Sequence, residues 1–460
     1  MRSATLIFSG NIASAVLLLC RTLLVARLVS VEDYGVAATF LVVMTFVEML
    51  SALGLQQQIV QSEDGENPRF QAGLQGFQLL RGCIAALIMF AMAAPVADFL
   101  GAPQAVDAYR WLSLVPLFNG LVHFDVYRLN RRMQFGPIIL SQTVPPLISL
   151  MLIWPLAIWL EDYRTLLWAM LVHMGLTSVI SHLMAQQPYR VLLDREIMAR
   201  SLRFGWPILI NGALLFAIFH GDKVIVARYF GLSDLAIFAM GFTLTLTPTL
   251  VVERSTQTLF LPQLSKALSA PSDRARYAAL SATVLEINLA AASILVIGCL
   301  VLGAPFIHFV LGEKYAPLIA LLPWFAVLQG LRLAKSAVSA PSLAMAHTGI
   351  GTLLNLPRVA TLPLAAWLAL TTGEPLLIVW VAILSELGSL GWMLVLMRRS
   401  LGLPIRPMIG PIVTTLVLMA IAILPLPWGL VPKELFVIAL FILSLSTMRS
   451  LRGYLRSPGH

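Results

Sequence analysis

The sequence predicts an all-α polytopic membrane protein with about 14 transmembrane helices, arranged as two parallel six-helix lobes followed by two C-terminal helices. Hydrophobic types make up 59% of the 460 residues and charged types only 12%, whereas a soluble domain carries about 25% charged residues. Fourteen helices of about 20 residues each would occupy about 280 residues, a share of the chain that matches its apolar fraction. This composition excludes a soluble enzyme, a disordered chain and a disulfide-rich secreted scaffold. A recurrence of apolar segments and an internal repeat support the same fold class.

Apolar segments separated by short polar breaks recur along the whole chain, and each is long enough to cross a bilayer. The predicted spans are 6–28, 34–55, 77–98, 108–128, 137–159, 164–186, 207–229, 235–256, 281–303, 316–338, 350–371, 375–397, 408–426 and 434–450. The last two are the least regular, because Pro425, Pro427 and Pro432 crowd their junction.

The distribution of positive charge predicts that both termini lie in the cytoplasm, since cytoplasmic loops are enriched in Lys and Arg. With this orientation, the cations gather in the inner loops and in the C-terminal tail, whereas the outer loops are short and nearly free of them. The net charge of +9, from 31 Lys and Arg against 22 Asp and Glu, therefore indicates membrane topology and no nucleic-acid partner.

The spans and loops divide the chain into four parts. Residues 1–187 form the predicted N-terminal six-helix lobe, and 207–400 the C-terminal one. Between them, 188–206 is predicted to form an interfacial cytoplasmic linker, because its apolar residues alternate with arginines that suit anionic headgroups. Residues 401–460 carry the thirteenth and fourteenth helices and a basic cytoplasmic tail.

An internal repeat relates the two lobes. The triplet Val-Ala-Arg at 25–27 recurs at 226–228, and Asp33 and Ala38 recur as Asp234 and Ala239, all at an offset of 201 residues. Each copy covers the end of one helix, a tight polar turn and the start of the next. Six helices separate the copies, so the lobes are predicted to be parallel repeats, as in transporters with a central binding site.

Ionisable residues inside the spans are the first candidates for a functional site, because each costs about 2.5–3.5 kcal/mol on insertion scales. The candidates for a substrate-binding cavity are Arg21, Asp222, Lys223, Arg358, Arg332 and Lys335. Arg21 and Asp222 are repeat equivalents and could pair. The alternatives are structural ion pairs, snorkelling of Arg358 to the inner surface, and an ordinary positive collar at Arg332 and Lys335.

Three acidic residues are candidates for coupling to an ion: Glu386, Glu48 and Asp125. A carboxylate in a low-dielectric cavity could carry a proton or ligate Na⁺; the alternative is a hydrogen bond to a neighbouring helix. Pro248, within Thr-Leu-Thr-Pro-Thr at 245–249, is the candidate hinge, with a static bend as the alternative.

The sequence contains no enzyme signature, so we expect no catalytic residues and no cofactor. There is no CxxC or Cys/His cluster for a metal, no HExxH, no GxSxG, and no GxxxxGK[ST] for nucleotide binding.

Several short patterns carry a resemblance to a known family. They are RTLLVARLVSVEDYGVAATF (21–40), RLNRRMQF (128–135), FGWPILINGALLFAIFHGDKVIVARYFGLSDLAIFAMGF (204–242), LFLPQLSKA (259–267) and GEKYAPLIALLPWFA (312–326). In these patterns the chain resembles the Wzx-like polysaccharide-biosynthesis flippases of the MOP (multidrug, oligosaccharidyl-lipid, polysaccharide) exporter superfamily. The resemblance implies two lobes in a V shape and a cationic cavity. The intramembrane carboxylates depart from a purely cationic cavity.

The resemblance also implies the function: transport of undecaprenyl-diphosphate-linked oligosaccharide from the inner to the outer leaflet of the bacterial inner membrane. The expected partners are this lipid-linked oligosaccharide, membrane lipids, a coupling H⁺ or Na⁺, and a polysaccharide polymerase or assembly complex. Two alternatives stay open: a cation-coupled drug or metabolite antiporter of the same superfamily, and a membrane-embedded polysaccharide polymerase or ligase. The short outer loops argue against the last, and a non-transporting scaffold is a further possibility.

Overall fold

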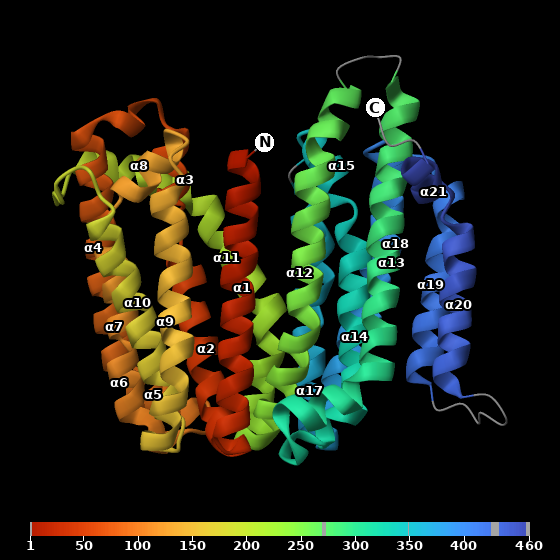
Figure 1. Ribbon diagram of the computed structural model, residues 1–460, viewed down its shortest axis with the longest axis horizontal. Coiled ribbons are helices and arrows are strands. Elements are labelled where there is room, and N and C mark those ends of the chain that lie inside the picture. The colour runs from red at the N-terminus through yellow and green to blue at the C-terminus, as the bar shows by residue number, and fades with distance from the viewer. Residues whose placement is uncertain (1, 269–272, 348, 425–431, 457–460) are drawn as a thin grey trace. The chain divides into compact units, whose positions relative to one another are not determined.

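The computed structural model describes residues 2–268, 273–347, 349–424 and 432–456, with side chains described only between residues 13 and 455. Within these ranges the chain forms helices and turns and no strand, which confirms the all-α prediction. The chain divides into two compact units, Met1–Ala236 and Ile237–His460, and the long helices of each are drawn in Figure 1.

Unit 1 is built around long helices that pack lengthwise. Helix α9 packs against both α1 and α10, α4 packs against α7, and α11 packs against α2 and α4. The helices are α1 (Arg2–Leu28), α2 (Val31–Ser51), α3 (Leu55–Gln61), α4 (Pro68–Ala91), α5 (Ala93–Phe99), α6 (Val106–Leu112), α7 (Leu114–Leu121), α8 (Asp125–Arg131), α9 (Gly136–Leu160), α10 (Arg164–Leu183) and α11 (Arg195–Tyr229).

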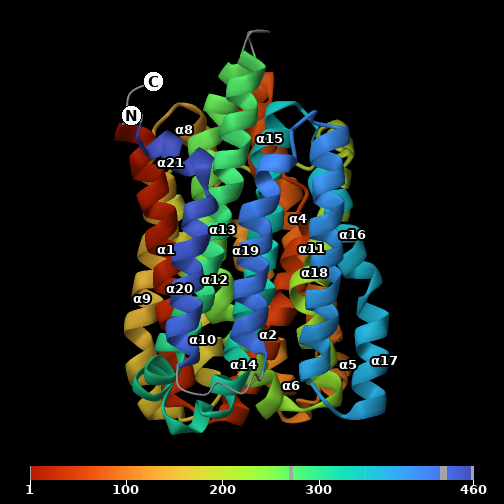
Figure 2. The ribbon, with the colours of Figure 1, turned by 90° about the vertical axis from the view of Figure 1, so that its right-hand side faces the viewer.

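In unit 2, α13 packs against α14 and α19, α18 packs against α14, α16 and α17, and α19 lies beside α20 (Figure 2). The helices are α12 (Leu232–Leu268), which begins in unit 1, α13 (Arg274–Phe306), α14 (Pro317–Ser336), α15 (Ser339–Ala344), α16 (Gly349–Ala360), α17 (Leu362–Thr372), α18 (Leu376–Arg399), α19 (Arg406–Ile423), α20 (Lys433–Thr447) and α21 (Arg449–Arg456). This arrangement places α14, α16 and α18 together at the centre of the candidate site.

Within the described residues, eleven helices are long and apolar enough to cross a membrane. A twelfth is added if α20 and α21, bent by 72° from each other, count as one span. The exact count of fourteen is therefore not confirmed. The two other predicted spans are 6–28, whose first side chains lie outside the described residues, and 108–128, which the structure divides among several short helices.

The predicted span 108–128 is interrupted because local polar contacts end its helices early. The Ser113 hydroxyl donates to the carbonyl of Arg110 at 2.6 Å, directly after α6 ends. Helix α7 ends when Val122 turns to an extended conformation, with ψ at 128°. A Cβ on Gly82 would lie 3.0 Å from the Cα of Gly120, so α4 and α7 pack with their backbones in close contact.

The predicted interfacial linker 188–206 is only partly a separate segment. Residues 188–194 are irregular, and Asp194 then caps a new helix by accepting hydrogen bonds from the amides of Glu196 and Ile197. This helix, α11, continues without a break to Tyr229 and passes through Pro207. The second part of the linker is therefore continuous with the seventh predicted span.

The 201-residue repeat is visible in the helix boundaries. Helix α1 ends at Leu28 and α2 begins at Val31, while α11 ends at Tyr229 and α12 begins at Leu232; both boundaries differ by 201 residues. The two turns also touch, because a Cβ placed on Gly35 of α2 would lie 2.0 Å from the carbonyl oxygen of Leu232. Only glycine allows this approach of the two backbones.

We predict that Gly35→Ala destabilises unit 1 by about 1–3 kcal/mol, because overpacking a tight backbone contact forces the helices apart. Thermal unfolding of the detergent-solubilised protein measures the effect. The matched control is Gly298→Ala in α13, where a Cβ meets nothing within 4 Å and helix propensity favours alanine. Equal midpoints for the two variants would contradict the tight contact.

Candidate functional site

Two cations on one face of α14 meet a single carboxylate of α18 inside unit 2. Arg332 and Lys335 are three residues apart, so their side chains lie on the same side of the helix. The Arg332 Nε lies 3.0 Å from Glu386 Oε1, and the Lys335 Nζ lies 2.7 Å from Glu386 Oε2. Glu386 is fully buried, so the ion pairs form away from bulk solvent.

Uncharged groups complete this cluster from three helices. The Arg332 guanidinium donates to the side-chain oxygen of Gln329 at 3.5 Å and lies over the ring of Phe242, 5.4 Å from its centroid. The Lys335 ammonium donates to the Asn355 side-chain oxygen at 3.0 Å and to the Leu354 carbonyl at 3.5 Å. Lys335 therefore ties α14 to α16 as well as to α18.

A third cation belongs to the same cluster. Arg358 of α16 is fully buried and lies close enough to Lys335 for their charges to interact. Glu253 of α12, which is half-buried, also interacts electrostatically with Lys335. We define Arg332, Lys335, Arg358 and Glu386 as the cation cluster. Burying three cations with one carboxylate is costly, and such a concentration of charge is typical of functional sites in membrane proteins.

In unit 1, Arg21 is buried on α1 and contacts α9 and α10. Its Nη1 donates to the Ser149 hydroxyl and to His173 Nδ1, both at 3.4 Å. Because arginine is only a donor, His173 Nδ1 must be unprotonated in this contact. The Ser149 hydroxyl in turn donates to the Ala169 carbonyl at 2.8 Å. Arg21 is thus held by neutral groups.

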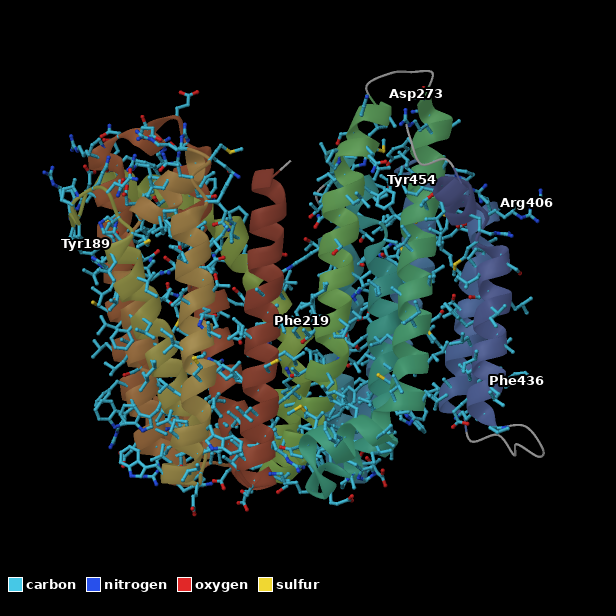
Figure 3. All side chains as sticks on the ribbon, viewed as in Figure 1. Tyr189, Phe219, Asp273, Arg406, Phe436 and Tyr454 are labelled. Carbon is cyan, nitrogen blue, oxygen red and sulfur yellow. The ribbon has the colours of Figure 1, made fainter. Side chains whose placement is uncertain are left out.

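Asp222 and Lys223 are both buried on α11, the helix that carries Phe219 in Figure 3. Lys223 lies near His220, whose ring stacks on Phe216 at 5.4 Å. The predicted pairing of Asp222 with Arg21 stays a prediction.

The candidates for ion coupling have three different surroundings. Glu48 is exposed on α2 and interacts electrostatically with Arg81 of α4. Asp125 accepts from Arg128 Nε at 2.5 Å and from the amides of Gln186 and Gln187 at 2.6 and 3.1 Å, an arrangement that favours a structural role. Both oxygens of Glu386 contact cations, so a coupling ion would have to displace one of them.

Pro248 lies inside α12, which continues through it to Leu268. The hydroxyls of Thr245, Thr247 and Thr249 donate to the carbonyls of Gly241, Thr243 and Leu246, respectively. They do not reach the carbonyl four residues before the proline, whose helical partner the proline removes. That missing bond is compatible with a hinge, which stays a prediction.

A family model described as "Polysaccharide biosynthesis protein" matches residues 24–320, more than half of the chain. The chain belongs to this polysaccharide biosynthesis protein family. The match extends from the end of α1 to the start of α14, and so includes parts of both units.

Two curated relatives of this polysaccharide biosynthesis protein have related names. This chain is 25% identical over 411 residues to the succinoglycan biosynthesis transport protein ExoT of Rhizobium meliloti (strain 1021). The match covers 86% of this chain and 81% of ExoT. This chain is 20% identical over 341 residues to the lipopolysaccharide biosynthesis protein WzxC of Escherichia coli (strain K12). The match covers 72% of this chain and 67% of WzxC.

The fold is similar to that of two solved transporters. The lipid II flippase MurJ in an inward closed conformation matches with a TM-score of 0.72 at 14% identity, covering 97% of this chain and 98% of that one. An inward-facing multidrug resistance MATE transporter of the MOP superfamily matches with a TM-score of 0.67 at 14% identity, covering 83% and 93%. The family match confirms the predicted polysaccharide-biosynthesis family, and the chain is a multi-pass membrane transporter rather than an enzyme.

The uncharged residues that contact Arg332, Lys335 and Arg21 were not among the site residues predicted from the sequence. Gln329 precedes Arg332 by three residues, and Asn355 precedes Arg358 by three. A polar residue one helical turn before an intramembrane cation was the available signal. His173 and Ser149 had no such signal, because their partner Arg21 is more than a hundred residues away in the sequence.

We predict that Glu386→Gln destabilises unit 2 by about 3–5 kcal/mol, since removing one partner of a buried ion pair leaves the other charge uncompensated. Thermal unfolding of the detergent-solubilised protein provides the measurement. Glu374→Gln is the matched control, because Glu374 is exposed at the turn before α18. Similar melting temperatures for the two variants would show that Glu386 does not hold the cluster together.

Proposed function

We propose that the protein flips undecaprenyl-diphosphate-linked oligosaccharide from the inner to the outer leaflet of the bacterial inner membrane for polysaccharide export. Membership of the polysaccharide biosynthesis family supports a role in glycan export. ExoT is named as a succinoglycan transport protein and MurJ as a lipid II flippase, and these names support a lipid-linked substrate. We infer that both termini lie in the cytoplasm, as the charge distribution of the loops suggests.

The cation cluster is the observation that carries this proposal. A diphosphate brings several negative oxygens, and arginine offers a planar fork of donors that matches them. Arg332 of α14 and Arg358 of α16 supply two such forks, and Lys335 adds a point charge that interacts electrostatically with both. Glu386 neutralises part of this charge while no substrate is bound, so an arriving diphosphate would replace a carboxylate with a more highly charged anion.

The proposed transport step is alternating access of two lobes around the bound headgroup, with the lipid tail remaining in the bilayer. The repeated helix boundaries at an offset of 201 residues support two lobes of common construction. An H⁺ or Na⁺ gradient or the membrane potential would supply the energy. Glu48 is a candidate for ion coupling, because it is a carboxylate within a span that interacts electrostatically with Arg81.

A cation-coupled drug or metabolite antiporter is the second candidate function, and the fold similarity to the MATE transporter supports it. A cationic drug would need a carboxylate that is open to it. The described contacts of Glu386 place a cation on each oxygen, and this favours an anionic substrate over a cationic one.

We predict that Arg332→Ala, Lys335→Ala and Arg358→Ala each slow flipping by about tenfold or more, because each removes a charge-assisted contact worth about 1.5–3 kcal/mol. The measurement is the rate at which a fluorescent undecaprenyl-diphosphate saccharide crosses the bilayer of proteoliposomes containing the full chain. Arg399→Ala, an exposed arginine at the end of α18, is the control and should retain the normal rate. Arg21→Ala is expected to be impaired as well.

All variants must first be shown to insert and to remain monodisperse. Wild-type protein that moves a cationic dye across the vesicle membrane, and leaves the lipid-linked saccharide in its original leaflet, would refute the flippase and support the antiporter. Normal flipping by all three cluster variants would leave the flippase standing and remove the cation cluster as its binding site.

A further inference from the structure

A cleft of about 210 Å³ lies in unit 1 and contains none of the residues of the cation cluster. The start of α4, the turn after α7 and the loop before α11 enclose it, and its lining includes Pro68, Gln71, Gln75, His123, Gln187 and Arg190. Tyr189, labelled in Figure 3, belongs to the loop that forms one wall.

The walls of the cleft are fixed by hydrogen bonds between segments that are distant in sequence. The Gln75 side-chain nitrogen donates to the Val122 carbonyl and to the Tyr189 hydroxyl, both at 3.1 Å. The Gln75 side-chain oxygen accepts from the Phe124 amide at 2.9 Å. Asp125 secures the loop before α11 by accepting from two of its amides. The cleft is therefore preorganised, which lowers the cost of binding.

One buried acceptor in this cleft is unsatisfied. Gln71 is 6% exposed, and its side-chain oxygen has no hydrogen-bond partner among the described residues. Buried polar atoms are nearly always paired, and leaving one unpaired costs about 1–3 kcal/mol. Gln71 is one of the residues that line the cleft, so a ligand with a hydroxyl group could satisfy this oxygen by donating a hydrogen bond.

One lining residue of the cleft, Arg190, is followed directly in the sequence by an exposed apolar segment, which we call the apolar rim. Arg190 is exposed at the mouth of the cleft, and it is followed by Val191, Leu192 and Leu193, which are 47%, 36% and 60% exposed. The amide of Leu192 donates to the Ala72 carbonyl of α4 at 3.0 Å, so this apolar rim is held against the protein. An arginine beside exposed aliphatic side chains is typical of a segment at the boundary between headgroups and acyl chains.

We propose that this cleft binds the headgroup of a membrane lipid in which a phosphate carries a hydroxyl-bearing group, as in phosphatidylglycerol. The phosphate contacts Arg190, a glycerol hydroxyl donates to the Gln71 oxygen, and the acyl chains lie along Val191, Leu192 and Leu193. The proposed binding requires none of the residues in the cation cluster, so lipid binding can be measured separately from transport.

The proposal is tested by titrating the purified full chain, in a neutral detergent, with short-chain phosphatidylglycerol and following tryptophan fluorescence. Short-chain phosphatidylcholine, which has a phosphate but no hydroxyl donor, should bind about tenfold more weakly or not at all. Glycerol 3-phosphate carries a phosphate and hydroxyl groups but no acyl chains, so it tests whether the ligand is a soluble anion and not a lipid. If it binds as tightly as phosphatidylglycerol, the ligand is a soluble anion and the lipid site is refuted.

Two variants and one control locate the binding. Arg190→Ala and Gln71→Leu should each weaken phosphatidylglycerol binding by about tenfold, while Arg203→Ala, which removes an exposed arginine of α11 outside the cleft, should change it by less than about twofold. Arg190 is exposed, so its variant tests the site even if Gln71→Leu folds poorly. Equal losses in Arg190→Ala and Arg203→Ala would mean non-specific attraction to basic residues and would overturn the proposal.

Discussion

The shared carboxylate of Glu386 is the constraint on which the centre of unit 2 depends. Arg332 and Lys335 can be buried in α14 only because α18 brings an opposite charge to both at 3.0 Å or less, since an unpaired charge in this environment would cost several kcal/mol. The same contacts fix the register of α14 against α18, and the bond from Lys335 to Asn355 extends this to α16. Any anion that enters must compete with a carboxylate already in place.

Unit 1 distributes its charges differently. Its closest ion pairs connect short helices and loops near the ends of the long helices, such as Arg132 with Glu66 and Arg200 with Asp64. The hydrogen bond from Arg132 lowers the pKa of Glu66 below its usual value, but both groups are partly exposed, so the pair contributes little to stability. Within its spans, Arg21 relies on serine and histidine. Arg21 is thus compensated by neutral hydrogen-bonding groups, whereas Asp125 and Arg128, which are also buried in unit 1, form an ion pair as the residues of the cation cluster do.

The sequence predicted the fold class and most of the spans because hydrophobic runs and loop charges are local signals. The repeat was also predictable, since both helix boundaries follow the identities at 25–27 and 226–228. The breaks within 108–128 were not predicted, because an apolar run does not show where side-chain contacts such as that of Ser113 with the Arg110 carbonyl accompany the end of a helix. Arg332, Lys335 and Glu386 were identified separately, but their meeting requires α14 to pack against α18, some fifty residues away, and a single sequence carries no such information.

The boundary between the two units falls at Ala236 and Ile237, inside the uninterrupted helix α12. The polypeptide therefore passes from one unit to the other within a continuous α-helix and not through a flexible linker. Bending the chain at this point would require stretching or breaking backbone hydrogen bonds of α12. A loop at the same position would carry no such cost, since it has no ladder of backbone hydrogen bonds to lose.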